Sequence, residues 1–273
     1  MQGKRIQKAI WTPLRLLGLA LLLGAVTMLP SSPVLAAEEP VPEEPVRTAA
    51  PEPAVLEEAA PPEEEGPRGI VGIVPAGEAL PDDTYFEDVV FLGDSRTEGL
   101  YLYGGLAEAE YLYAMGANVE SVFTKADWGP EEGEKVPLLD ALLESGRSRI
   151  YVMLGVNELG WPETEMFRTR YTTLLERLRA DHPEADIVIQ SILPVSAKQD
   201  AQGTYVNNGR IDAYNRVLLE LAEELEYPYL DVAEAMRDEA GCLRSDLTYD
   251  GVHLNKSGCR VWLDYLRTHP LPV

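Results

Sequence analysis

The stretch FLGDSRTEG (residues 91–99) joins an apolar run to a polar turn and then to a helix-forming segment. Residues 89–92 are short, apolar and β-prone, which predicts a buried strand. Gly93 permits a tight turn, and the spacing of Ser95 and Glu98 matches the Ser-x-x-Glu capping box of a helix start. Ser95 is therefore either a helix cap or a nucleophile, and the rest of the chain has to decide between them.

Outward from this stretch, β-rich apolar runs alternate with amphipathic segments. The sequence predicts further strands at residues 111–115, 150–154, 186–192 and 229–232, and helices at residues 135–143, 163–180, 210–225 and 256–267. Strands that alternate with helices indicate an α/β fold in which helices cover both faces of a parallel sheet. In such sheets, ligands bind beyond the carboxyl ends of the strands.

Polar residues of the types used in acyl transfer follow several of these strands. Serine comes after the first strand, and Asp250 and His253 follow the fifth in DGVH. A serine nucleophile needs a base within hydrogen-bond reach, and histidine suits that task near neutral pH. His253 is the only one of the three histidines with an acid three residues earlier. The alternative is that DGVH is an Asp-Gly turn before the last helix, with Asn255 as the helix cap.

Two other loops offer donors for an oxyanion. The N–H groups of Ser95 and Gly116 and the side-chain amide of Asn157 could converge on a developing negative charge, where each preorganised donor is worth roughly 3 to 4 kcal/mol. The alternatives are a glycine that permits a turn and an asparagine that lies in an ordinary loop.

Taken together, these motifs resemble a known family. Gly93-Asp94-Ser95, Gly116, Gly155-x-Asn157 and Asp250-x-x-His253 occur in the order of the four blocks of the SGNH, or GDSL-type, hydrolases. The resemblance implies a flavodoxin-like three-layer α/β/α sandwich around a mostly parallel five-stranded sheet, in an exported bacterial member. It also implies a serine esterase with Ser95, His253 and Asp250 as triad, and with Ser95, Gly116 and Asn157 as the oxyanion hole.

The chain departs from the family pattern at two positions. The usual leucine after the serine is Arg96, and the usual aspartate after the third-block asparagine is Glu158. Neither change removes a catalytic group, but both bear on the substrate. Arg96, Glu158, Trp161 and Tyr101 are candidate substrate-lining residues.

The composition of the chain limits the classes of molecule that it is expected to bind. The net charge of −23 argues against nucleic acid and against anionic lipid headgroups, because both need basic patches. The sequence contains no P-loop, no G-x-G-x-x-G and no Cys/His cluster with zinc spacing, so no cofactor and no metal is expected. We expect a monomer that acts on an acylated small molecule or glycan.

The chain divides into three parts. Residues 1–36 read as a signal peptide, with a basic start, an apolar run at 16–29 and a small-residue cleavage site at 34–36. An uncleaved membrane anchor is the alternative; either way the rest is secreted or extracytoplasmic. Residues 37–80 are acidic and proline-rich, which predicts a disordered linker, and residues 81–273 form the hydrolase domain. Cys242 and Cys259 are either bridged or reduced and buried.

These observations favour an exported esterase that removes O-acyl groups, most simply O-acetyl groups, from cell-wall or other polysaccharide. Tyr101, Tyr103 and Trp161 lie close in sequence to the proposed site and could stack on sugar rings. Two alternatives remain open: an O-acyltransferase that uses the same triad, and a non-catalytic glycan-binding module on the same scaffold.

Overall fold

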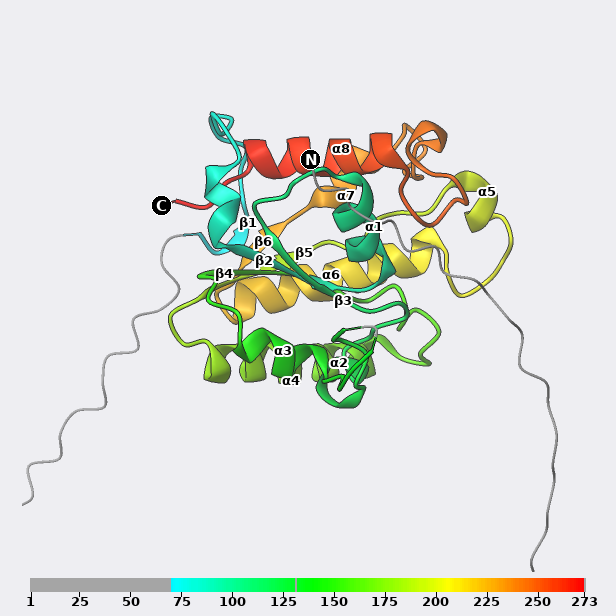
Figure 1. Ribbon diagram of the computed structural model, residues 1–273. Coiled ribbons are helices and arrows are strands. Elements are labelled where there is room, and N and C mark those ends of the chain that lie inside the picture. Colours follow the sequence, from blue (N-terminus) through cyan, green and yellow to red (C-terminus); the bar gives the residue numbers. More distant parts are fainter. Residues whose placement is uncertain (1–69, 131, 273) are drawn as a thin grey trace, which may run out of the picture. The chain divides into compact units, whose positions relative to one another are not determined.

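A single parallel sheet organises the part of the chain that the computed structural model describes, residues 70–130 and 132–272. The strands lie in the order β1-β6-β5-β4-β2-β3, and every neighbouring pair is parallel (Figure 1). They are β1 (Gly72–Ile73), β2 (Val89–Gly93), β3 (Glu110–Tyr113), β4 (Arg149–Met153), β5 (Asp186–Gln190) and β6 (Pro228–Leu230). The α/β class is confirmed, with six strands rather than five. The predicted signal peptide and most of the predicted linker lie outside the described residues.

Helices cover both faces of the sheet (Figure 1). One layer contains the 3₁₀ turn η1 (Thr84–Asp88) and helices α1 (Ser95–Tyr103), α7 (Val232–Met236) and α8 (Lys256–Thr268). The other contains α2 (Ser121–Thr124), α3 (Leu138–Leu143), α4 (Thr164–Asp181) and α6 (Asn208–Glu224). Helix α5 (Ala197–Asp200) and the 3₁₀ turn η2 (Ser245–Leu247) lie in loops. The result is the predicted three-layer sandwich.

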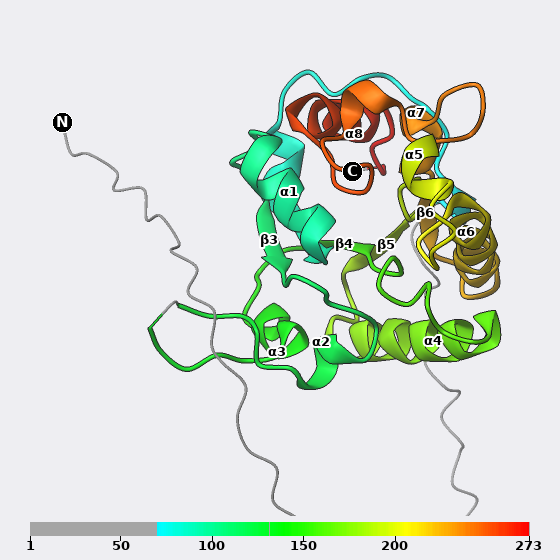
Figure 2. The ribbon, with the colours of Figure 1, turned by 90° about the vertical axis from the view of Figure 1, so that its right-hand side faces the viewer.

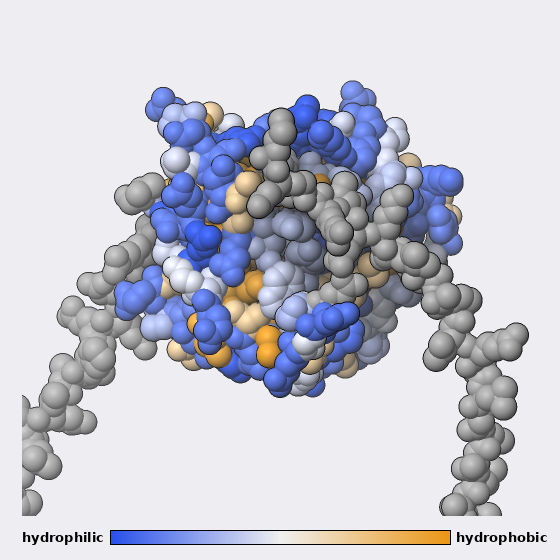
Figure 3. All heavy atoms as spheres, viewed as in Figure 1, coloured by the Kyte–Doolittle hydropathy of each residue, from blue (hydrophilic) through white to orange (hydrophobic). Residues whose placement is uncertain are grey.

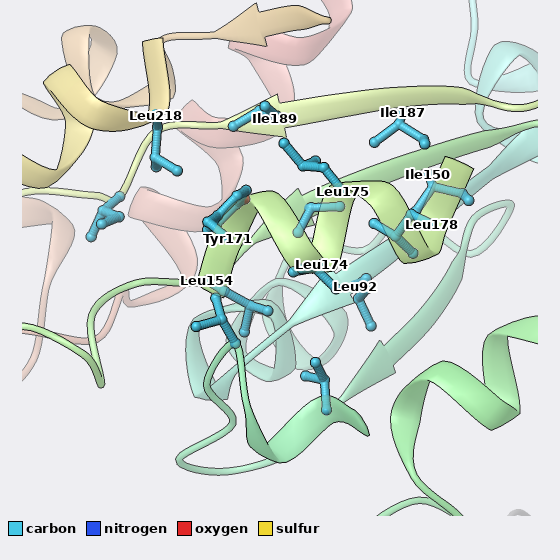
Figure 4. Packing of buried hydrophobic residues seen from close by; sticks show 14 of the residues in the cluster. Leu92, Ile150, Leu154, Tyr171, Leu174, Leu175, Leu178, Ile187, Ile189 and Leu218 are labelled. Carbon is cyan, nitrogen blue, oxygen red and sulfur yellow. The ribbon is translucent and has the colours of Figure 1, made fainter. Parts of the chain in front are cut away.

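The core has two hydrophobic clusters, one on each face of the sheet, because successive side chains of each strand point to opposite faces. In β2, Val90 and Leu92 pack into the cluster beneath α4, whereas Val89 and Phe91 pack into the cluster beneath α8. This follows from the two-residue period of a strand, which sends successive side chains to opposite faces. Figure 4 shows the first cluster, in which leucines of α4 meet the side chains of β2, β4 and β5. Because both faces are buried, the strands read as continuous apolar runs.

The folded domain begins earlier than residue 81. Strand β1 pairs with β6 through hydrogen bonds from Gly72 N to Tyr227 O (3.0 Å) and from Val74 N to Tyr229 O (2.9 Å). The side chain of Val74 is buried in the core. The predicted linker boundary at residue 80 is therefore too late, because the apolar run at residues 72–74 completes the edge of the sheet.

Both cysteines are buried and unpaired. Cys242 Sγ accepts a hydrogen bond from Asn208 Nδ2 at 3.4 Å, while Cys259 Sγ donates to Gly99 O on α1 at 3.4 Å. The two thiols thus lie against different elements. Of the two alternatives that the sequence left open, the structure has the reduced, buried pair.

Candidate active site

The turn between β2 and α1 exposes Ser95. Gly93 ends β2 where a Cβ atom would lie 2.1 Å from Thr97 Oγ1 and 2.7 Å from Met153 O, so only glycine fits. Asp94 then caps the helix, because its side chain accepts a hydrogen bond from Arg96 N at 2.8 Å. The expected cap was Ser95, but Ser95 is instead the first helical residue. Its hydroxyl is therefore left free for another partner.

That partner is His253. Ser95 Oγ and His253 Nε2 lie 3.0 Å apart, although 158 residues separate them in the chain. On the other side of the ring, His253 Nδ1 lies 2.7 Å from Asp250 Oδ2. Such a chain of contacts lets the histidine accept the serine proton while the carboxylate orients the ring. The structure thus brings together all three residues of the predicted triad.

Backbone hydrogen bonds hold Asp250 in place. Its Oδ1 accepts the N–H groups of Val252 and His253, each at 2.8 Å. Burial raises the pKa of this carboxyl, but the stronger combined effect of the His253 side chain and these N–H groups lowers it below its ordinary value. The carboxylate is therefore ionised near neutral pH, as the orienting role requires.

The loop before α8 is braced on two sides. Thr248 Oγ1 donates to His253 O at 2.6 Å and accepts from Gly251 N at 2.9 Å. Gly251 O in turn accepts from Ser196 N, just before α5. Asn255 caps α8, as predicted, through hydrogen bonds from Ser257 N and Gly258 N. These contacts fix the position of the histidine relative to the sheet.

Asn157 faces the same pocket from the segment after β4. Its Nδ2 donates to Ala117 O at 2.8 Å, which fixes the direction of the side-chain amide. A primary amide has two N–H groups, so one remains for a ligand. The backbone N–H of Ser95 is likewise without a partner within α1, because the first N–H groups of a helix have no carbonyl to bond. Two donors are thus available beside the Ser95 hydroxyl.

A small pocket opens at this point. Its volume is about 170 Å³, well below the ~300–1,000 Å³ of sites for drug-sized ligands. The lining residues are Ser95, Arg96, Val156, Asn157, Gln199, Tyr205, Val206, Val252 and His253. Figure 2 shows this carboxyl edge of the sheet, with α1 on one side and α5 on the other. The pocket therefore accepts a small group next to the reactive hydroxyl.

Three buried ionisable side chains lie near Ser95: Asp94, Arg96 and Glu158. Burial raises the pKa of Asp94, and burial lowers the pKa of Arg96 to about 10 against the opposing effects of Asp94 and Asp250. Arg96 Nη1 donates to Leu193 O at 2.7 Å.

Glu158 is fully buried, and burial raises its pKa to about 8, so this side chain is protonated at neutral pH. Its Oε1 accepts from Val119 N at 2.8 Å, which joins the segments after β3 and β4.

The segment that contains this site matches a known protein family. Residues 91–261 match the model of the GDSL-like Lipase/Acylhydrolase family, which is more than half of the chain and includes every residue of the Ser95–His253–Asp250 contact.

The chain belongs to the GDSL-like Lipase/Acylhydrolase family. It is accordingly an acyl hydrolase.

Several solved structures share its fold. A Streptococcus pneumonia protein provisionally named a platelet activating factor is 24% identical, with a TM-score of 0.55 over 66% of this chain and 82% of that one. A provisionally named acylhydrolase from Bacteroides fragilis is 16% identical (TM-score 0.50; 72% and 88% covered). A provisionally named lipolytic protein of the G-D-S-L family from Desulfitobacterium hafniense is also 16% identical (TM-score 0.50; 66% and 97% covered). No curated protein matches the chain.

Gly116 of this GDSL-like hydrolase does not line the pocket. It is exposed in a turn closed by a hydrogen bond from Ala117 N to Ala114 O at 3.0 Å, and its φ of +73° is what a type II turn requires at the third position. Gly116 is thus a turn glycine, and its role as an oxyanion donor stays a prediction. The same loop serves the site in another way, because the Ala117 carbonyl orients Asn157.

Of the four candidate substrate-lining residues, one lines the pocket and three do not. Arg96 lines the pocket, whereas Glu158 is buried behind it, Trp161 packs against the core and Tyr101 lies exposed on α1. The pocket is also lined by five residues that the sequence did not indicate: Val156, Gln199, Tyr205, Val206 and Val252. Gln199, Tyr205 and Val206 follow β5, so the rule that sites gather beyond strand ends was the signal that could have indicated them. In the described part of this GDSL-like hydrolase, no group of three His, Cys, Asp or Glu residues could hold a metal ion.

Proposed function

We propose that this acyl hydrolase is an exported serine esterase that removes O-acyl groups, above all O-acetyl groups, from cell-wall or other polysaccharide. The observation that carries the proposal is the Ser95–His253–Asp250 hydrogen-bond chain at the mouth of a small pocket.

The proposed reaction proceeds in two halves. Ser95 Oγ attacks the ester carbonyl while His253 Nε2 takes the hydroxyl proton, and the oxyanion is held by the Ser95 N–H and the free N–H of Asn157. Collapse breaks the ester C–O bond, and the imidazolium returns the proton to the departing alcohol. Water then attacks the acyl-serine with His253 as base, which releases the carboxylic acid and restores the serine. Asp250 orients the imidazole and stabilises its charged form.

Pocket size supports a short acyl group. Val156, Val206 and Val252 give the pocket an apolar component, while Gln199 and Asn157 give it polar groups. At about 170 Å³ the pocket is small, so it suits an acetyl group better than a long acyl chain. We therefore expect kcat/KM to fall as the acyl chain lengthens.

Support for the location and the acceptor comes from the sequence. The basic start and apolar run of residues 1–36 have the pattern of an export signal, and export favours an extracellular polymer as the substrate.

The test begins with chain-length dependence. Aryl acetate, butyrate and octanoate are compared by kcat/KM, and a fluorophosphonate probe is used to label the protein and its Ser95→Ala variant. The proposal expects the order acetate over butyrate over octanoate and labelling that needs Ser95. Acetate release from acetylated polysaccharides then tests the acceptor, and product analysis with an added glycan shows whether a sugar hydroxyl replaces water. Equal rates for all three esters, or no labelling, would contradict the proposal.

A further inference from the structure

An exposed aromatic side chain stands directly beside the triad. The ring of Tyr249 stacks on His253, with the centroids 6.0 Å apart and the planes at 12°. Tyr249 is 67% exposed, although its neighbours in the loop are braced by hydrogen bonds. A large ring that faces solvent at the mouth of a site is available to a ligand outside the pocket.

Further aromatic rings follow along α1 and β3. Tyr101 and Tyr103 on α1 are 52% and 47% exposed. The Tyr101 ring lies 5.6 Å from that of Tyr113, which closes β3, and Tyr113 lies 5.4 Å from Trp128 in the following loop. We call Tyr249, Tyr103, Tyr101, Tyr113 and Trp128 the aromatic strip.

The Glu98 carboxylate acts electrostatically on two members of the aromatic strip, Tyr113 and Tyr249. It lies on α1, one turn after Ser95. Burial and then the negative charge of Glu98 raise the pKa of Tyr113, and Glu98 is also among the groups that, after burial and Asp250, raise the pKa of Tyr249. The Tyr103 side chain likewise contributes to raising the pKa of Tyr249. The negative charge of the half-buried Glu98 carboxylate thus acts on both Tyr113 and Tyr249.

The aromatic strip and the acyl pocket lie on opposite sides of the triad. The pocket continues from Ser95 towards α5 and the loop after it, through Gln199 and Tyr205. The strip continues over α1 and β3, which Figure 2 shows on the other side of the carboxyl edge. An ester that places its acyl group in the pocket therefore directs its alcohol part towards the strip.

We infer that the aromatic strip binds a neutral polysaccharide chain and presents its O-acyl groups to Ser95, an inference that rests on the proposed function. Aromatic side chains offer large, rigid apolar faces, which suit the C–H faces of sugar rings, while the Glu98 carboxylate can accept hydroxyl hydrogen bonds.

Charge favours a neutral glycan over a polyanion. The charged groups that act on Tyr113 and Tyr249 are the carboxylates of Glu98 and Asp250, Lys125 near Trp128 is paired with Asp127, and the whole chain has a net charge of −23. A polyuronate or a nucleic acid would be repelled. Figure 3, in the view of Figure 1, shows a surface on which blue, hydrophilic residues predominate.

The test measures binding separately from turnover. Calorimetry measures the binding of four unacetylated ligands: hexasaccharides of β-1,4-linked xylose, glucose and N-acetylglucosamine, and a hexagalacturonate. The proteins compared are the full chain and its variants Tyr101→Ala, Trp128→Ala and Trp128→Phe. The control is Leu143→Ala, because Leu143 is an apolar residue at the end of α3 that is about as exposed as Tyr101. We expect at least one neutral hexasaccharide to bind, both alanine variants to weaken it roughly three- to tenfold, and Trp128→Phe to restore most of the affinity.

Several outcomes would overturn the inference. These are binding of none of the neutral hexasaccharides, a preference for hexagalacturonate, or affinities of the Tyr101 and Trp128 variants equal to that of Leu143→Ala. Thermal melting of each variant separates loss of binding from loss of fold, and Tyr101→Ala removes a largely exposed side chain. Failure of the proposed function has a different signature, which is the absence of acetate release from every acetylated glycan while neutral hexasaccharides still bind.

Discussion

Ser95 and His253 depend on each other for reactivity. The serine is a weak nucleophile without the base, and the base has nothing to activate without the serine. Their 3.0 Å contact and the 2.7 Å contact of His253 with Asp250 make one proton-transfer unit from residues on two distant loops.

This coupling makes the effects of mutation non-additive. Ser95→Ala and His253→Ala are each expected to lower kcat for aryl acetate at least about 10³-fold, and the double variant should be little slower than either. Circular dichroism and thermal melting serve as controls for the fold. If the two losses multiply in the double variant, the residues do not act as a unit.

Glu158 gives the stability a dependence on pH. Its folded pKa of about 8 lies above the ordinary glutamate value of 4.5 because the side chain is buried. Between these values the unfolded chain releases the proton and the folded chain keeps it, so the free energy of unfolding falls as pH rises. Glu158→Gln removes the ionisation, and its stability relative to the parent chain should therefore increase from pH 5 to pH 8.

Urea unfolding at several pH values measures this difference. Glu176→Gln on the exposed face of α4 is the matched control, and it should follow the parent curve. Parallel curves for Glu158→Gln and the parent chain would mean that Glu158 ionises as readily in the folded state as in the unfolded one.

At the scale of elements, the N-terminus of α8 secures the catalytic loop. Asn255 Oδ1 accepts the N–H groups of Ser257 and Gly258, while its Nδ2 donates to Asp246 O at 2.8 Å. One side chain thus caps the helix and ties down the loop that carries Asp250 and His253.

Two substitutions separate these roles. Asn255→Ala loses both and should lower the free energy of unfolding by about 1 kcal/mol or more, with a fall in kcat. Asn255→Asp keeps the cap acceptor and loses only the donors to the loop. We expect its stability to recover and its kcat to stay low, as measured by urea unfolding and aryl acetate turnover. Equal recovery of both quantities would show that the contact with Asp246 does not position the loop.

At the scale of the whole molecule, the first strand belongs to the domain. A chain of residues 70–273 keeps β1 and Val74, whereas a chain of residues 81–273 loses them and exposes the edge of β6. Burial of one valine contributes about 1.5–3 kcal/mol, and the backbone hydrogen bonds donated by the N–H groups of Gly72, Val74, Gly77 and Leu80 are lost as well. The shorter chain should therefore melt several degrees lower. Identical melting temperatures would place β1 outside the cooperative fold.

The proposed export has a direct test. The pattern of residues 1–36 predicts a mature N-terminus near Ala37. N-terminal sequencing of the protein recovered from the medium or the cell surface checks it, and an intact Met1 there would indicate the uncleaved anchor instead.

Sequence patterning determined the sandwich because its signals are local. Strand and helix periodicity needs only neighbouring residues, so the five main strands and four main helices were predicted with boundaries shifted by a few residues. Strand β1, helices α2, α5 and α7 and the turns η1 and η2 were not predicted. Each is too short for its own periodicity to show, and each is held by tertiary packing.

The sequence by itself determined which residues meet at the site. The parallel sheet places its strand ends at one edge, so Ser95, Asn157, Asp250 and His253 had to converge there. Only the tertiary structure decided how they are supported: Asp94 rather than Ser95 caps α1, Gly116 lies in a tight turn, and the Ala117 carbonyl orients Asn157. The lining of the pocket by Gln199 and Tyr205 was also decided there. A motif records the residue types that a reaction needs, whereas hydrogen bonds between distant loops depend on relative positions that no local pattern encodes.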